Sequence, residues 1–178
     1  MRKQISAYCD GSSNGAAGGP TGWGWLIVDW DADDIVCAGS AGAPVGTNNT
    51  AELQAAIHGL RAILDRGLEQ GNDVELVSDS TYTLNLANGS YVAKSHLDLV
   101  KTLRELVRLT GAKTRWVRGH AGDAFNEQVD RLAKAGRDKY ATVETRKRRR
   151  SRKREERRRK RAIVKEYKRR VYGTTRVT

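Results

Sequence analysis

Cysteine is scarce in this sequence, and long apolar runs are absent. The only cysteines among the 178 residues are Cys9 and Cys37, which lie in separate apolar runs without the spacing of metal ligands. We therefore expect two free thiols in a reducing compartment, the cytoplasm, rather than a disulfide or a zinc site. No run is apolar for long enough to cross a bilayer and the N-terminus lacks an apolar secretory stretch, so we expect no membrane association.

The basic residues are distributed unevenly along the chain. Residues 1–140 contain 15 Lys and Arg against 17 Asp and Glu, a net charge of −2, whereas residues 141–178 contain 18 against 4, a net charge of +14. About 140 residues are enough for one domain with its own core. The sequence therefore predicts a nearly neutral domain over residues 1–141 and a highly basic tail over residues 142–178.

The N-terminal part of the chain has the pattern of three antiparallel strands. A short apolar run ends at Asp10 and a Gly/Ser-rich turn follows it, while residues 23–28 and 35–41 are rich in aromatic and β-branched residues. The aspartates between residues 29 and 34 alternate as in a calcium loop. However, Asp34 and Ser40 stand where such a loop has Gly and Glu. We interpret this segment as a solvated hairpin tip.

Helical and strand patterns alternate in the rest of the domain. Apolar residues with helical spacing run from Leu53 to Leu64, and Asn49 followed by Glu52 matches a capping box at the start of this helix. The later elements are a strand over residues 74–78, a short helix to residue 86, a helix from Ser95 to Gly111, a strand over residues 114–117 and a helix from about Asn126. The order β-β-β-α-β-α-α-β-α predicts an α/β fold with a mixed five-stranded sheet flanked by helices.

Carboxylates occur at matching places in this pattern. Asp10 ends the first strand, Asp79 ends the fourth, and Glu52 lies in the helix between them. If the first and fourth strands are parallel neighbours, both aspartates lie at the carboxyl edge of the sheet, where open α/β sheets bind ligands. Asp130, early in the last helix, is a fourth candidate.

A cluster of carboxylates requires compensation for its charge. Adjacent carboxylates repel each other, and hard divalent cations such as Mg²⁺ or Mn²⁺ relieve that repulsion. Two such ions about 3.5–4 Å apart can hold the attacking water and the leaving oxygen of a phosphodiester. Simpler roles stay open. Glu52 could serve as a helix cap and nothing more, and Asp130 could merely stabilise the helix dipole as an acid near the helix start. Both strand-end aspartates could be turn residues.

Four segments together resemble type I ribonuclease H in order and spacing over about residues 1–140. They are Tyr8–Ser12 (YCDGS), Thr47–Leu53 (TNNTAEL), Val77–Ser80 (VSDS) and the stretch from Trp116 to Ala133, which contains WVRGHAG and NEQVDRLA. The resemblance implies an endoribonuclease that hydrolyses the RNA strand of RNA/DNA hybrids and leaves 5′-phosphate and 3′-hydroxyl ends. It also implies a ribonuclease H-like fold, and we expect a monomer.

The resemblance further implies roles for individual residues. The metal-binding tetrad would be Asp10, Glu52, Asp79 and Asp130, holding two Mg²⁺ ions in the substrate complex, with Mn²⁺ able to replace them. His120 would move protons or help product to leave. The residues implied to contact the RNA backbone and its 2′-hydroxyls are Gly11, Ser12, Asn14, Asn48 and Ser80.

Two departures from the family pattern concern substrate binding. Residues 88–95 are too few to hold the inserted basic helix of many members, and Ala16-Ala17 stands where members often have Asn-Pro. We therefore keep two alternatives, a non-catalytic nucleic-acid-binding module and a DNA-directed nuclease of the same fold.

The basic tail is a second candidate for substrate binding. Residues 146–170 consist mostly of Arg, Lys and Glu, which are good helix formers, but repulsion among the cations opposes a helix in the free chain. We expect this segment to be mobile, or helical on binding nucleic acid, and to hold the nucleic acid backbone without sequence specificity. A solubility or targeting role, or binding of ribosomal RNA, is the alternative.

Overall fold

The computed structural model describes residues 2–14, 18–119, 121–141 and 143–172. The chain forms two units, residues 1–140 and residues 141–178. The first unit contains the strands β1 (Gln4–Ser13), β2 (Gly19–Asp29), β3 (Asp34–Gly46), β4 (Asp73–Ser78) and β5 (Lys113–Trp116). Its helices are α1 (Asn48–Leu64), α2 (Thr81–Ala87), α3 (Leu97–Thr110) and α4 (Ala124–Tyr140).

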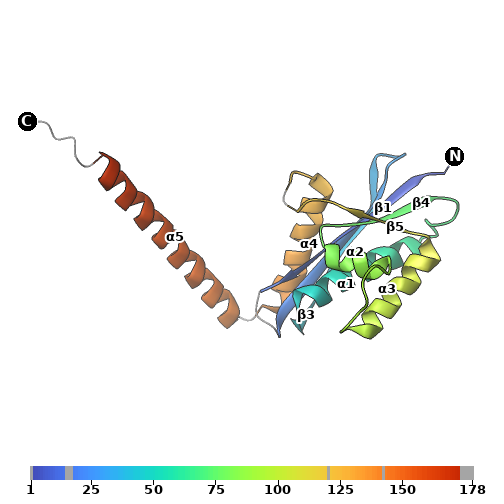
Figure 1. The fold of residues 1–178 in the computed structure, drawn as a ribbon, viewed down its shortest axis with the longest axis horizontal. Coiled ribbons are helices and arrows are strands. Elements are labelled where there is room, and N and C mark those ends of the chain that lie inside the picture. The colour runs from blue at the N-terminus through green and yellow to red at the C-terminus, as the bar shows by residue number, and fades with distance from the viewer. Residues whose placement is uncertain (1, 15–17, 120, 142, 173–178) are drawn as a thin grey trace, which may run out of the picture. The chain divides into compact units, whose positions relative to one another are not determined.

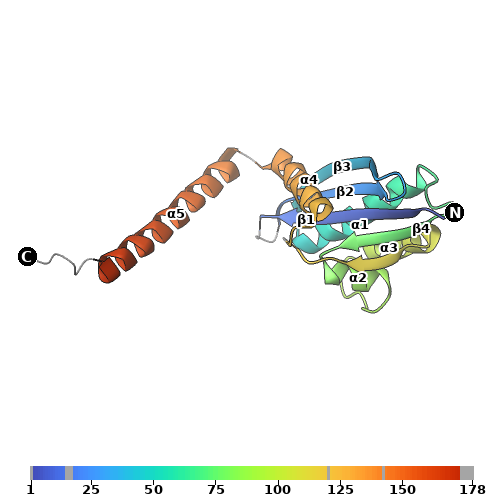
Figure 2. The same cartoon turned by 90° about the horizontal axis from the view of Figure 1, so that it is seen from above.

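The five strands form one mixed sheet in the order β3-β2-β1-β4-β5. Pairing is antiparallel between β1 and β2 and between β2 and β3, and it is parallel between β1 and β4 and between β4 and β5. Figure 2 shows β3, β2, β1 and β4 side by side in this order. The predicted α/β fold with a mixed five-stranded sheet is confirmed.

Helices cover both faces of the sheet (Figure 1). Alternate residues of a strand point to opposite faces, so β1 contributes Ile5, Ala7 and Cys9 to a large core with α1 and α3. Tyr8 points the other way into a smaller core with Leu26, Val28, Val77 and Val129, the last of which belongs to α4. The central strand is therefore buried on both sides, which fixes the backbone that carries Asp10.

Helix α4 lies unusually close to the sheet because β2 carries glycine beneath it. A Cβ on Gly24 would lie 2.6 Å from the carbonyl oxygen of Val129, so a side chain there would push the helix away. The hydroxyl of Ser40 on β3 also donates a hydrogen bond to the carbonyl of Leu132 at 2.7 Å. These contacts bring the middle of α4, including Asp130, towards β1.

The start of α1 differs from the prediction. Its N-cap is Thr47, not Asn49, and the capping box joins the Thr47 and Thr50 hydroxyls to each other's backbone N–H groups. Threonine hydroxyls satisfy the free N–H groups of the first turn, so this helix does not need a carboxylate as its cap. The interpretation of Glu52 as only a capping residue is therefore wrong.

Two other boundaries also need correction. Strand β1 does not end at Asp10, because its antiparallel ladder with β2 continues to the pair Ser13 and Thr21. The N-cap of α3 is His96, in the left-handed conformation and without a side-chain cap, rather than Ser95. The predicted stop of α3 at Gly111 is confirmed, with a φ of 65° at that residue.

The aspartates between β2 and β3 form a hairpin tip, as predicted. The Asp29 carboxylate accepts hydrogen bonds from the backbone N–H groups of Asp31 and Ala32 and from the Lys3 ammonium at 2.8 Å. Lys3 lowers the pKa of Asp29 from its usual value. The Asp29 carboxylate thus stabilises the turn and forms an ion pair with Lys3.

The second unit contains one helix, α5 (Val143–Tyr172), of 30 residues. Two ion pairs with i,i+4 spacing lie on it, Glu155 with Arg159 and Glu156 with Lys160, each at 2.8 Å. None of the helices in the described residues is both long and apolar enough to cross a membrane.

Candidate active site

The parallel pairing of β1 and β4 positions two of the predicted acids. The last pair in this ladder is Tyr8 with Val77, and Asp10 and Asp79 each lie two residues further on. Both carboxylates therefore leave the same edge of the sheet, as the sequence predicted from the adjacency of these strands.

Glu52 joins them because α1 packs directly on the β1 backbone. A Cβ on Gly11 would lie 2.7 Å from the carbonyl carbon of Ala51 and 2.9 Å from Cα of Glu52, so only glycine allows this approach. The side-chain amide of Asn48, one turn before Glu52, donates a hydrogen bond to its Oε1 at 3.2 Å. This bond orients Oε1 of Glu52 and leaves Oε2 available to a different partner.

The three carboxylates form a compact cluster in which Asp10 and Glu52 are buried and Asp79 is half-buried. One oxygen from each of Asp10, Glu52 and Asp79 lies within 4.8 Å of the others. Asp10 is 7% exposed and Glu52 is 6% exposed, and Oε2 of Glu52 is buried without a hydrogen-bond partner. A buried polar atom without a partner is costly. An all-oxygen donor set with one such atom fits a hard divalent cation.

The electrostatics of the cluster agree with its geometry. Burial, followed by the charges of Asp79 and Asp130, raises the pKa of Asp10 to about 7. Burial and the charges of Asp10 and Asp79 raise the pKa of Glu52 well above its usual value. Both shifts penalise the ionised form, so a cation that neutralises the cluster binds favourably.

Asp130 lies near this cluster without belonging to it. Its charge contributes to the raised pKa of Asp10, which places it within electrostatic reach. Its carboxylate forms an ion pair with the Lys134 ammonium, one turn further along α4. The fourth predicted acid therefore has a cation of its own in this state of the protein.

The end of β5 and the segment after it contact Asp79. The indole Nε1 of Trp116 donates a hydrogen bond to the backbone carbonyl of Asp79 at 3.1 Å. Gly119 lies against Oδ2 of Asp79. The next residue, His120, lies outside the described residues.

The residues predicted to contact RNA differ in their hydrogen bonding. Gly11 and Ser12 belong to β1, and Asn14 follows it half-buried. The Ser12 hydroxyl accepts a hydrogen bond from Nη1 of Arg137 at 2.6 Å. The Ser80 hydroxyl caps α2, where it accepts a bond from the N–H of Thr83.

Sequence reasoning missed several residues around the site. Lys134 has a readable signal, because it follows Asp130 with the i,i+4 spacing of helical ion pairs. Arg137 is 5% exposed and holds the end of β1, yet no feature of the sequence distinguishes it from an exposed arginine on α4. Trp116 was noticed only as part of a motif, without its bond to Asp79.

The sequence matches the profile of RNase H over residues 2–138. The chain belongs to the RNase H family. Ribonuclease H of Pseudomonas fluorescens is 35% identical over 151 residues, which cover 78% of this chain and 95% of that protein. Ribonuclease H of Brucella ovis is 34% identical over 160 residues, which cover 82% of this chain and 98% of that protein. These relatives confirm the predicted family and enzyme class.

Solved RNase H structures share the fold of residues 1–140. RNase H1 from the archaeon Halobacterium salinarum superposes with a TM-score of 0.60 at 35% identity, covering 76% of this chain and 98% of that one. The N-terminal RNase H domain of a Mycobacterium tuberculosis protein, solved as a fusion with maltose-binding protein, gives a TM-score of 0.68 at 25% identity. That comparison covers 78% of this chain and 96% of the other. The ribonuclease H-like sheet topology is therefore confirmed.

Proposed function

We propose that this RNase H family member is an endoribonuclease that hydrolyses the RNA strand of RNA/DNA hybrids and leaves 5′-phosphate and 3′-hydroxyl ends. The observation that carries the proposal is the cluster of Asp10, Glu52 and Asp79, in which Asp10 and Glu52 are buried and one oxygen of Glu52 is left without a hydrogen-bond partner. Membership of the family, whose relatives bear the name ribonuclease H, supports the substrate class.

The acids would hold two Mg²⁺ ions in the substrate complex, with Mn²⁺ as a substitute. Asp10, Glu52 and Asp79 would supply most of the ligands, and Asp130 would complete the set. When bound, the ions supply an activated water and stabilise the charge on the leaving oxygen.

The protein's own residues perform the positioning. Asn48 fixes one oxygen of Glu52, and Trp116 fixes the backbone of Asp79, so two of the acids are oriented before substrate arrives. His120 would carry a proton to or from the reacting phosphate or assist product release. Contacts with RNA would come from Gly11, Ser12, Asn14, Asn48 and Ser80, with the 2′-hydroxyl distinguishing RNA from DNA.

A single-turnover cleavage assay on an end-labelled hybrid tests the proposal. Asp10→Asn should lower the rate by more than about a hundredfold, because it removes a charged ligand from the centre of the cluster. The matched control is Asp33→Asn, which removes one carboxylate at the exposed hairpin tip. Equal cleavage by Asp10→Asn and the wild type would refute the assignment of the site.

Substrate and product analysis test the remaining parts. When hybrid, duplex DNA and duplex RNA are compared as substrates, only the RNA strand of the hybrid should be cleaved. EDTA should abolish this cleavage. Extension of the products by a DNA polymerase would reveal the 3′-hydroxyl. Binding of hybrid without cleavage in saturating Mg²⁺ or Mn²⁺ would favour a non-catalytic module instead.

A further inference from the structure

Helix α5 concentrates positive charge to an extent that no other element approaches. Residues 146–170 contain 17 Lys and Arg, 12 of them Arg. Every residue from 150 to 164 is exposed. A helix of 30 residues is about 45 Å long, so this element presents a long row of cations to the solvent.

The cations are not spread evenly around the helix. Ser151, Glu155, Ala162 and Glu166 follow one another at spacings of four, seven and four residues, which places them along one stripe. The opposite side carries only cations over three turns, at the helical spacing i, i+3, i+4, i+7 and i+11. We call these residues the basic face: Arg150, Lys153, Arg154, Arg157 and Arg161.

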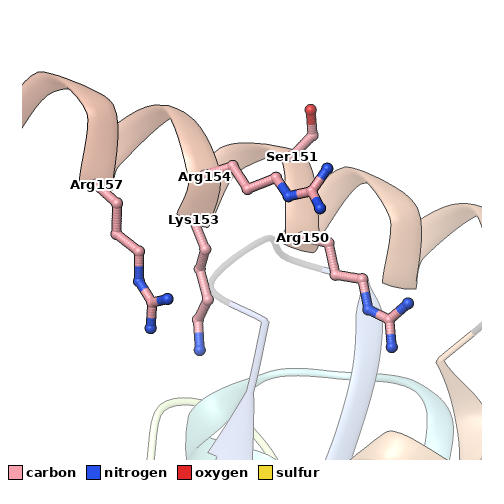
Figure 3. A pocket seen from close by; sticks show the side chains of 5 residues that line it. All are labelled: Arg150, Ser151, Lys153, Arg154 and Arg157. Carbon is pink, nitrogen blue, oxygen red and sulfur yellow. The ribbon is translucent and has the colours of Figure 1, made fainter.

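Figure 3 shows Arg150, Lys153 and Arg157 extending from the same side of α5, while Ser151 points away from them. Within residues 150–164, whose side chains the structure describes, the ion pairs use Arg159 and Lys160, neither of which belongs to the basic face. Glu155 and Glu156 thus pair with cations beside the basic face and leave its own five charges to an external partner.

The chemistry of α5 discriminates between possible polyanions. A helix that lies in a membrane surface needs an apolar face opposite its cations, but the opposite stripe here carries Ser151, Glu155 and Glu166. Proteins that hold single strands stack bases on aromatic side chains, and Tyr167 is the only aromatic residue in 146–170. Neither a membrane surface nor a nucleic-acid single strand therefore fits the residues of α5.

A nucleic-acid duplex fits it better. Arginine binds phosphate with two parallel hydrogen bonds, and four of the five cations of the basic face are Arg. From Arg150 to Arg161 the helix rises about 16 Å, a length over which a duplex carries roughly ten phosphates on its two strands. A one-sided row of cations, most of them guanidinium groups, can therefore contact several phosphates along one side of a duplex.

We propose that α5 is a one-sided duplex-binding helix. Its basic face lies along the phosphate backbone of the RNA/DNA hybrid, while the stripe that contains Glu155 and Glu166 faces solvent. Binding is independent of base sequence. The choice of the hybrid as the duplex rests on the proposed function, whereas the one-sided arrangement is argued from the charge distribution of α5 alone.

Two double variants of the full chain with equal charge test the proposal. Arg150→Gln with Arg157→Gln removes two cations from the basic face. Arg152→Gln with Arg159→Gln removes two cations, seven residues apart in the same way, from the side that carries Glu155. Binding to a fluorescent hybrid is measured in EDTA, which prevents cleavage, over a series of salt concentrations.

The first variant should bind roughly tenfold more weakly at low salt. The slope of log K against log salt should fall by about two, because two phosphate contacts are lost. The second should change Kd less than about threefold and keep the slope. Equal losses in the two variants would overturn the one-sided arrangement, and the absence of loss in both would overturn duplex binding by α5. Single-stranded RNA or DNA bound as tightly as the hybrid would overturn the choice of duplex.

Circular dichroism of both variants shows whether α5 stays helical, since Gln is a good helix former. Single-turnover cleavage at saturating hybrid should be unchanged in both, because neither touches the carboxylate cluster. Loss of cleavage with normal binding, as expected for Asp10→Asn, tests the proposed function. Loss of binding with normal cleavage at saturating hybrid, as expected for Arg150→Gln with Arg157→Gln, tests the role of α5.

Discussion

The carboxylate cluster and the basic face both bring like charges together, but the first does so largely in the interior of the fold and the second on an exposed helix. Asp10 in β1, Glu52 in α1 and Asp79 in the loop after β4 are brought together by the packing of the backbone, and burial penalises the ionisation of Asp10 and Glu52. The cations of α5 follow one another along a single exposed helix, where water and salt screen them. The cluster therefore suits a small ion held in fixed geometry, whereas the basic face suits a long polyanion and depends on salt.

The largest disruption of the buried cluster is expected from Gly11→Ala. The new Cβ would collide with Ala51 and Glu52, so α1 must move away from β1. We expect a loss of about 1–3 kcal/mol in the free energy of unfolding from overpacking. The cleavage rate should fall more than about tenfold, because a displacement of about 1 Å between catalytic groups is costly. Urea titration and the hybrid assay measure the two effects.

Gly59→Ala is the matched control in the same region. Its Cβ would meet Ala7 Cβ at 3.5 Å and Trp25 Cβ at 3.6 Å, which are ordinary contacts. Since alanine favours the interior of a helix, this change should raise the free energy of unfolding by roughly 0.5–1 kcal/mol. If both glycines tolerated alanine equally, the close approach of α1 would not be what assembles the site.

The next effect is a dependence of stability on pH and metal. The folded pKa of Asp10, about 7, lies above its ordinary value of 3.8. A carboxyl with a raised folded pKa destabilises the fold as it ionises. Metal-free protein should therefore lose stability, on the order of a few kcal/mol, as pH rises from about 4 to above 7. Asp10→Asn should flatten this profile, and Mg²⁺ should raise Tm more at pH 8 than at pH 5.

Thermal unfolding in EDTA and in Mg²⁺ across this pH range provides the check. An Asp10→Asn protein with the same pH profile as the wild type would mean that Asp10 carries no repulsion in the folded state.

A smaller effect is expected from Lys134, which forms an ion pair with Asp130 beside the carboxylate cluster. Lys134→Gln removes the ion pair with Asp130 and a positive charge near Asp10. Calorimetric titration should then show Mg²⁺ or Mn²⁺ binding several-fold more tightly, because no internal cation competes for Asp130. Lys139→Gln, exposed on the same helix, should leave the titration unchanged. Weaker metal binding by Lys134→Gln would show that the lysine supports the ligand set instead.

The smallest effect is expected on α5. Replacing Glu155 and Glu156 by Gln removes both i,i+4 pairs and makes the helix more positive. Helical circular dichroism should fall slightly at low salt and recover as salt screens the cations, while Tm of the first unit stays the same. A fall in Tm would indicate that the two units depend on each other for stability.

The sequence predicted those parts of the site that depend on strand order. The apolar runs before Asp10 and Asp79 predicted two strands, and the expectation that both acids share one edge depended on these strands being parallel neighbours, as the β1–β4 ladder shows them to be. It did not predict which residue caps α1, because Thr47, Asn49 and Thr50 are all good capping residues and tertiary packing decides among them. Nor could it reveal the buried Arg137, whose environment depends on how closely α4 approaches the sheet.

The separation of the three acids along the chain has a consequence for how the protein matures. Asp10 lies in β1, Glu52 in α1 and Asp79 just after β4, and only completed pairing of β1 with β4 and docking of α1 bring them together. Contacts between distant parts of a chain form slowly, because the entropy of closing the loop between them is lost first. On the proposed function, a partly folded chain would have scattered carboxylates and no metal site, so hydrolysis would have to wait until the fold is complete.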